Sequence, residues 1–160
     1  MGFKEVKAYL NQAGYGDRVT EFTVSSATVE LAAQALHCPS AWIAKTLSFM
    51  VGEQPILLVT AGDARIDNAH YKAQFHQKAK MMTAEELEHF TGLHFGGVCP
   101  FAVPAPVEVW LDASLKRFEI VYPACGSDNS AVRVTIPELE KLSQAKGWVD
   151  VCKGWREQEA

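Results

Sequence analysis

A lysine interrupts an apolar strand pattern in the segment AWIAKTLSFMV, residues 41–51. From Ile43 onward every second residue is apolar except Lys45, and this period is typical of a strand with one buried face. An ammonium on the apolar side of a strand can extend along the surface until it reaches solvent. Alternatively it faces a cleft, where the low dielectric strengthens its field. In a cleft, Lys45 could contact a carbonyl or phosphate group of a substrate.

Two glycine-containing stretches have neither helix nor strand character and could form the walls of such a cleft. The first glycine stretch, HFGGVCPFAVPAP (94–106), contains Gly96 and Gly97, and the second, PACGSDNS (123–130), contains Gly126. Glycine lets the backbone come close to a ligand, and exposed N–H groups in such turns can bind an anion or a carbonyl oxygen. Either stretch alone could be an ordinary turn. Together with the strand lysine they predict a site that stabilises charge on a carbonyl or phosphate oxygen.

A thiol in the first glycine stretch, Cys99, is the candidate nucleophile of the chain. A reactive thiolate needs an activating base or cation. The sequence places none visibly beside Cys99, which favours a packed, neutral thiol. The chain contains no serine-hydrolase elbow, zinc-protease motif or phosphate-binding glycine loop, and its scattered cysteines form no zinc or disulfide framework. We expect no metal and no cofactor.

The elements that must position these residues are short and irregularly ordered. Thr28 is a good N-cap for a helix over residues 29–36, in which Leu31, Ala35 and Leu36 are expected to face inward. Strands and helices do not alternate strictly, which favours the α/β class with a mixed sheet surrounded by helices. With 160 residues and no linker or repeat, we expect one domain over residues 1–160. Helices are expected at about residues 3–10, 29–36, 67–75, 83–90 and 136–145, and strands at about 43–51, 56–62, 107–112, 117–124 and 131–136.

Charge and hydropathy limit the classes of partner. A net charge of −4 argues against a protein that coats nucleic acid nonspecifically, because that affinity comes from phosphate neutralisation. One stretch, HYKAQFHQKAK, carries Lys72, Lys78 and Lys80 without an acid, and it is either a solvated face or a phosphate contact. No apolar run approaches the roughly 20 residues of a membrane span. We therefore expect a cytoplasmic protein without a membrane or DNA partner.

Four blocks of the chain resemble, in order, the YbaK/ProX family, the freestanding relatives of the editing domain inserted in bacterial prolyl-tRNA synthetases. They are TVELAAQALHCPSAWIAKTLSFMV, PILLVTAGDARID, GGVCPFAV and VYPACGSDNSAVRVT. The similarity runs from about Val24 to about Val151. Its most specific parts are the strand lysine, the Gly-x-x-x-Pro loop from Gly96 to Pro100, and the glycine of ACGS. One departure is visible, because the family often continues the loop as Pro-Phe-Gly and this chain has Ala102 after its phenylalanine.

The resemblance implies a fold with a barrel-like mixed sheet and a deacylase that hydrolyses the ester of mischarged tRNA in trans. It implies that water attacks the ester with help from a ribose hydroxyl of the tRNA, without a metal or a protein nucleophile. By this resemblance Lys45 orients the aminoacyl end, and N–H groups of the Gly97 and Gly126 loops support the oxyanion. Substrate contacts are further expected from Gly96, Val98, Cys99, Pro100, Phe101, Ser127, Asp128 and Asn129.

Several properties stay open at this stage. The amino acid removed can be alanine, serine, threonine or cysteine, because small pockets separate such side chains only weakly. Lys72, Lys78 and Lys80 are candidates for contact with the tRNA acceptor stem, while a synthetase partner and the oligomeric state are undecided. Two other functions compete with the deacylase. One is a non-catalytic module that binds tRNA or a synthetase, and the other is a hydrolase of small thioesters or amides that depends on Cys99.

Overall fold

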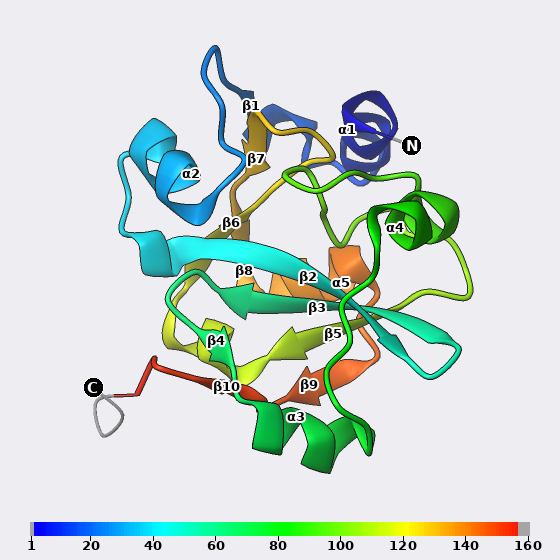
Figure 1. The fold of residues 1–160 in the computed structure, drawn as a ribbon. Coiled ribbons are helices and arrows are strands. Elements are labelled where there is room, and N and C mark those ends of the chain that lie inside the picture. The colour runs from blue at the N-terminus through cyan, green and yellow to red at the C-terminus, as the bar shows by residue number, and fades with distance from the viewer. Residues whose placement is uncertain (1, 157–160) are drawn as a thin grey trace.

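The computed structural model describes residues 2–156, and its long strands lie in the segments that the apolar patterns indicate. Six strands form one mixed sheet in the order β8-β6-β2-β3-β5-β9. The sheet curls into a half-barrel with helices around it (Figure 1), which confirms the predicted α/β class and barrel-like sheet. The strands are β1 (Val19–Glu21), β2 (Ile43–Val51), β3 (Gln54–Ala61), β4 (Arg65–Ile66), β5 (Glu108–Asp112), β6 (Ile120–Pro123), β7 (Ser130–Val132), β8 (Val134–Thr135), β9 (Gly147–Val149) and β10 (Cys152–Lys153).

The strand that carries Lys45 is one arm of a long antiparallel hairpin at the centre of this sheet. β2 and β3 pair along nearly their whole length, and Lys45 lies opposite Thr60. β3 is a continuous apolar run and is buried from Pro55 to Ala61, as expected for a strand covered on both faces. The predicted central hairpin is confirmed.

The outer edge of β2 is paired only at its two ends. Its parallel pairing with β6 stops at Ala44 opposite Pro123. The edge is next attached by two bonds to the segment before α4, from Met50 N–H to the Lys80 carbonyl at 2.9 Å and from Met82 N–H to the Ser48 carbonyl at 3.0 Å. Between these attachments no strand of the described chain pairs with β2 on this side. The sheet therefore has an opening beside residues 45–47.

The helices begin at the caps that the sequence predicts. Thr28 accepts a bond from Leu31 N–H at 3.2 Å, and Thr83 forms a capping box with Glu86, so each satisfies an N–H group that the first turn leaves unpaired. No helix within residues 2–156 is long and apolar enough to cross a membrane. The helices are α1 (Phe3–Gln12), α2 (Val29–Leu36), α3 (Asn68–Phe75), α4 (Ala84–Thr91) and α5 (Ile136–Ser143), with 3-10 turns η1 (Gly16–Arg18), η2 (Ser40–Trp42) and η3 (Ala113–Arg117).

One expectation for α2 is wrong. Ala32 and Ala33 are the buried residues of this helix, packed against Ile43, whereas Leu31 is 39% exposed. The small alanine side chains let the helix lie close to the start of β2. This rotation of the helix leaves Leu31 on its outer side.

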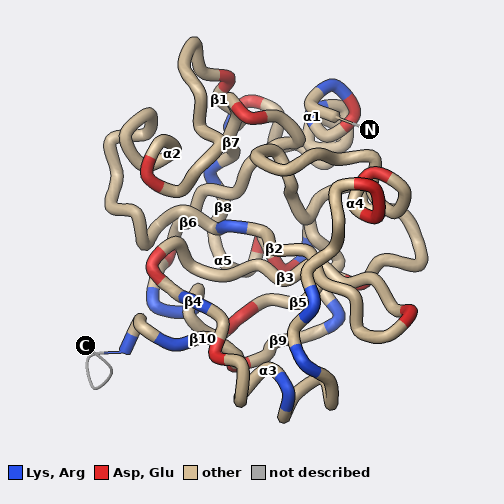
Figure 2. The backbone as a smooth tube through the Cα atoms, in the orientation of Figure 1, with Lys and Arg blue, Asp and Glu red and all other residues tan. Residues whose placement is uncertain are grey.

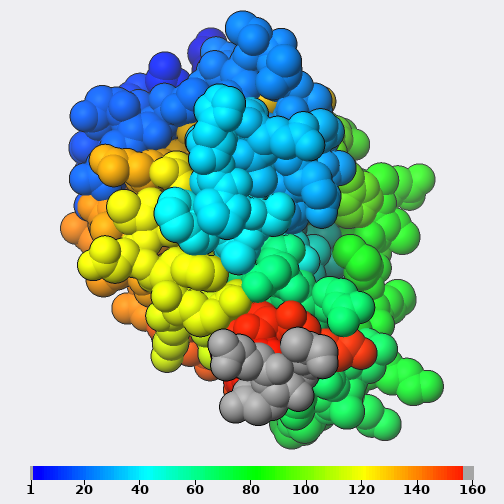
Figure 3. Space-filling view, turned by 90° about the vertical axis from the view of Figure 1, so that its left-hand side faces the viewer, coloured from blue at the N-terminus to red at the C-terminus, as the bar shows by residue number. Residues whose placement is uncertain are grey.

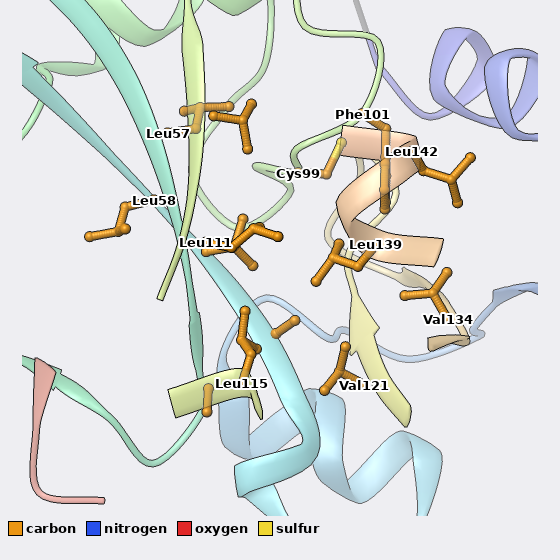
Figure 4. Packing of buried hydrophobic residues seen from close by; sticks show 14 of the residues in the cluster. Leu57, Leu58, Cys99, Phe101, Leu111, Leu115, Val121, Val134, Leu139 and Leu142 are labelled. Atoms are coloured by element: carbon orange, nitrogen blue, oxygen red, sulfur yellow. The ribbon is translucent and has the colours of Figure 1, made fainter. Parts of the chain in front are cut away.

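The main core fills the space between the concave side of the sheet and α5. Leu57, Leu111 and Leu139 are fully buried there, and Figure 4 shows that Cys99 and Phe101 enter the same cluster from the first glycine stretch. The first glycine stretch is thus anchored in the core directly after its glycines.

Candidate active site

A cavity of about 200 Å³ lies at the opening between β2 and β6. β2 forms its floor, the residues before and at the start of α2 form one wall, and Gly96 and Val98 contribute to another. Lys45 is the only charged residue among the described residues that line it. A bound group would therefore meet one positive charge among neutral side chains.

The ammonium of Lys45, a lining residue of this cavity, is held by two backbone carbonyl groups of residues that do not line it. Nζ donates to the carbonyl oxygens of Gly62, at 3.4 Å, and Ala64 in the turn after β3. Lys45 is half-buried, and burial is the main cause that lowers its pKa from the ordinary value. An ammonium has three protons to donate, so one remains for a bound substrate. Of the two arrangements considered for this lysine, the structure has the cleft and not the solvent-exposed rim.

The turn after β3, whose carbonyl groups bind Lys45, packs closely against α2 and η2. A Cβ atom on Gly62 would lie 2.0 Å from the carbonyl oxygen of Ser40 and 2.8 Å from a methyl group of Val29. Figure 3 shows the α2–η2 region packed directly against the green β3–β4 turn on this face of the molecule. Only glycine fits here, so this residue brings the carbonyl groups within reach of the ammonium.

The two glycine stretches, far apart in sequence, touch each other at the cavity wall. Gly96 has a φ of 95°, in the region where residues with a Cβ are strained. A Cβ on Gly97 would lie 2.9 Å from three backbone atoms of Ser127. The contact between Gly97 and Ser127 therefore needs a glycine, and it joins the two stretches into one wall.

Neither of the two glycines expected to donate to an oxyanion lines the cavity. Gly97 N–H is already bonded to the carbonyl of His94 at 3.1 Å. Gly126 packs against the start of α1, where its Cβ would lie 2.9 Å from atoms of Gly2 and Val6. Gly97 N–H is therefore not free to support an oxyanion, and Gly126 packs on α1 outside the cavity lining. The oxyanion role predicted for N–H groups of the two loops stays a prediction for their other residues.

Of the residues that follow Gly97, one lines the cavity and the next three are buried in the core. Val98 lines the cavity, whereas Cys99 and Phe101 are fully buried in the main core and Pro100 is buried beside them. Burial raises the pKa of Cys99 to about 12, so the thiolate is rare at neutral pH. We expected Cys99, Pro100 and Phe101 to contact substrate. Instead they are buried and anchor the first glycine stretch in the core.

The loop exit keeps the backbone conformation that glycine would adopt. Ala102 has a φ of 57°, which is the left-handed region and costs an L-residue roughly 1–2 kcal/mol. Ala102 thus occupies, in place of glycine, a backbone conformation that glycine adopts without strain.

The polar residues of the second glycine stretch support the cavity from behind. The Asn129 side chain donates to the Phe22 carbonyl at 3.0 Å, and the backbone carbonyl of Asp128 accepts from Ser26 N–H at 2.6 Å. The Ser127 hydroxyl bonds to that of Ser130 at 2.7 Å. None of Ser127, Asp128 and Asn129 lines the cavity. We expected these three residues to contact substrate, but Asp128 and Asn129 hold the segment that carries Ser26, and Ser127 bonds within its own stretch.

Three cavity residues were missed by the sequence analysis. The hydroxyl groups of Ser26, Thr46 and Ser48 line the cavity, are buried, and have no hydrogen-bond partner among the described residues. Buried polar groups are almost always bonded, so three such groups in one cavity point to a polar ligand or to water. The alternation of Thr46 and Ser48 in an apolar strand was a usable signal, whereas nothing local marks Ser26.

The mouth of the cavity is apolar. Met81 and Phe95, from different segments of the chain, both line the cavity, and each is 53% exposed. Single exposed apolar side chains are common, but two that line the same cavity indicate a contact surface. An aromatic ring at a pocket mouth is a platform on which a flat base or ring can stack.

The three lysines singled out in the sequence, here called the lysine patch (Lys72, Lys78 and Lys80), are all exposed. Lys72 lies in α3, and the other two lie in the segment that runs from α3 towards α4, where Figure 2 shows basic positions without acidic ones. Lys80 directly precedes Met81 of the mouth. No lysine of the patch forms an ion pair with a residue in the described range.

No group of three or more metal-ligating side chains is found within residues 2–156. Asp63, which lies in the turn between Gly62 and Ala64, is bonded through both carboxylate oxygens to Arg117 at 2.9 and 2.5 Å.

The sequence of the chain is similar to known proteins over most of its length. Residues 23–142 match the family described as aminoacyl-tRNA editing domain. The chain is 49% identical over 156 residues to the uncharacterized protein YwhH of Bacillus subtilis (strain 168), and the alignment covers 97% of this chain and 99% of that protein.

Solved structures resemble the whole fold. A candidate trans-editing enzyme for prolyl-tRNA synthetase has a TM-score of 0.84 and 29% identity, with 94% of this chain and 96% of that chain covered. The hypothetical protein APE2540 has a TM-score of 0.81 and 25% identity, with 93% of this chain and 99% of that chain covered.

Proposed function

Because the chain belongs to the aminoacyl-tRNA editing domain family, we propose that it is a deacylase that hydrolyses the ester of mischarged tRNA. We further propose that it acts in trans, in the cytoplasm, on a tRNA that a synthetase has released with a small amino acid attached. The similarity to a candidate trans-editing enzyme supports this reading.

The observation that carries the proposal is the cavity with Lys45 as its only charged lining residue in the described chain. An aminoacyl ester has a small polar head, and its carbonyl oxygen gains negative charge when water attacks. A fixed ammonium in a partly desolvated site stabilises that charge more in the transition state than in the ground state. The exposed Phe95 and Met81 at the mouth offer an apolar surface for the terminal base of the tRNA.

In the proposed reaction a water molecule adds to the ester carbonyl carbon. The bond between this carbon and the ribose oxygen then breaks, the ribose oxygen takes a proton, and a free amino acid and an uncharged tRNA result. The neighbouring ribose hydroxyl relays the proton in this scheme. The chain needs no nucleophile of its own, in keeping with the burial of Cys99.

The experiment that tests the proposal is single-turnover deacylation with purified protein. Alanyl, seryl, threonyl and cysteinyl esters of noncognate tRNAs are compared with correctly charged tRNAs and with spontaneous hydrolysis. Rapid loss of at least one mischarged ester supports the deacylase. Binding of charged tRNA without cleavage of any ester would support the non-catalytic module instead.

Cys99→Ala is expected to leave deacylation within about twofold of the wild type, because the thiol lies in the core and not in the cavity. Removing the buried sulfur should cost stability, at roughly 1 kcal/mol. The measurements are kcat/KM for deacylation and the thermal midpoint. A folded Cys99→Ala protein without activity, or a covalent adduct on Cys99, would support the thiol-dependent hydrolase.

We propose that the lysine patch contacts the phosphates of the acceptor stem. Replacing all three lysines with alanine is expected to weaken tRNA binding at low salt. It should also reduce the slope of log Kd against log salt concentration by about one for each lysine that contacts a phosphate.

The matched control for the lysine patch replaces Lys4, Lys7 and Lys141, which are exposed on α1 and α5. This control removes the same net charge from other surfaces. Equal salt slopes for the two triple variants would mean that the patch acts only through net charge.

A further inference from the structure

The unpaired part of the β2 edge offers hydrogen-bonding groups of the backbone to the cavity. Along a strand, the N–H and C=O of one residue point to one side and those of the next residue point to the other. Met50 N–H and the Ser48 carbonyl are bonded towards the segment before α4, so the even-numbered residues of β2 face this outer edge. Thr46 is the even-numbered residue between the two attachments, and it lines the cavity.

Thr46 is therefore free for a ligand in two ways. Its N–H and C=O face the opening, where no strand of the described chain pairs with β2. Its hydroxyl is buried and lacks a partner among the described residues, as does that of Ser48 two positions on. In an antiparallel sheet one residue with this orientation exchanges two bonds with the residue opposite, N–H to C=O and C=O to N–H.

This inference rests on the proposed function. We propose that Thr46 binds the aminoacyl group through the two backbone hydrogen bonds that it would form with a residue of a neighbouring strand. The Thr46 carbonyl accepts a hydrogen bond from the α-amino group of the substrate, and Thr46 N–H donates to the ester carbonyl oxygen. As water adds to the carbonyl carbon, the same N–H bonds to the oxyanion. It supplies the backbone donor that Gly97 cannot supply, because Gly97 N–H is bonded to His94.

This assignment gives Lys45 and Thr46 different parts in the site. The Lys45 ammonium, held by two carbonyl groups, provides a positive field. The Thr46 N–H, fixed in the hairpin by the pairing of β2 with β3, provides a directed bond. Backbone donors on a strand need no reorientation during the reaction, which makes them effective oxyanion donors.

The test removes one backbone N–H without changing a side chain. In a Thr46→Val protein, the amide at position 46 is replaced by an ester through incorporation of the α-hydroxy analogue of valine. The Thr46→Val protein with a normal amide is the reference. Loss of the N–H is expected to lower kcat for deacylation by about 100-fold or more relative to this reference. Equal kcat values, within twofold, would overturn the proposal.

A matched control places the same α-hydroxy analogue at Val51. This residue lies on the same strand, opposite Gln54, and its N–H, at an odd-numbered position, faces β3 and not the cavity. The Val51 ester removes a bond to β3 and is expected to lower thermal stability at least as much as the Thr46 ester, while kcat stays within twofold of the wild type. A loss of kcat at Val51 equal to that at Thr46 would mean that the effect comes from strand stability, and would overturn the proposal.

A second measurement uses the unmodified protein. Binding of alanine in amide linkage to 3′-amino-3′-deoxyadenosine is expected to shift the Thr46 amide resonance and to slow its hydrogen exchange at least tenfold, with little change at Val51. A response at other cavity residues without one at Thr46 would overturn the proposal. If the wild type deacylates no tRNA, the proposed function fails; if it does and Thr46 does not respond, only the present inference fails.

Discussion

Replacing Lys45 with methionine is expected to lower kcat for deacylation of the preferred mischarged tRNA by about 10²- to 10³-fold. This is the usual effect of removing one group that stabilises a developing oxyanion. Methionine keeps the apolar stem of the side chain and removes the only charge among the described residues that line the cavity. The measurement is single-turnover kinetics at saturating protein, so that weaker tRNA binding does not hide the chemical step.

The Lys45 variant needs a control for stability, because its ammonium also bonds to the carbonyl groups of Gly62 and Ala64. Thermal unfolding of Lys45→Met shows whether the turn after β3 is lost with the charge. Lys141→Ala, which removes an exposed charge from α5, should match the wild type. A folded Lys45→Met protein with undiminished hydrolysis would exclude the lysine from the mechanism.

Gly97→Ala is expected to separate the two glycine stretches and to open the cavity wall. The new methyl group would lie 2.9 Å from three backbone atoms of Ser127, and a backbone cannot rotate away as a side chain can. We expect a loss of about 1–3 kcal/mol in the free energy of unfolding, as for other overpacked sites. Deacylation should fall at least tenfold, because Gly96 and Val98 beside it line the cavity.

The control for Gly97→Ala is Gly147→Ala in β9. Its Cβ would meet the Trp110 ring at 3.4 Å, an ordinary contact, so both stability and activity should change little. Denaturant unfolding and deacylation assays on both variants separate a local contact effect from a general cost of removing glycine. A Gly97→Ala protein as stable and active as Gly147→Ala would show that the wall does not depend on this contact.

The parts of the fold that follow from local sequence were predicted correctly. The central hairpin and the caps at Thr28 and Thr83 depend on residues next to one another in the chain, where period and hydrogen-bonding type decide the structure. The assignment to the editing-domain family is also confirmed, because its motifs occur in order along the chain.

The details of the site depend on contacts between distant segments, and local sequence does not contain them. Gly97 looks like a free donor until His94 takes its N–H. Cys99 was expected to be a packed, neutral thiol that still contacts substrate, and the core encloses it completely. Leu31 is the larger side chain of α2, yet the alanines face β2 because they permit close approach. In each case tertiary packing decided which group meets the cavity.

The opening beside β2 also bears on the solubility of the protein. An unpaired sheet edge can recruit a strand from another molecule and start aggregation. Here Ser26, Gly96 and Val98 line the cavity of about 200 Å³ beside this free edge, so other segments of the chain flank it. Variants that move these segments away from β2 are thus expected to self-associate as well as to lose activity. The packing that shapes the substrate site also keeps the protein monodisperse.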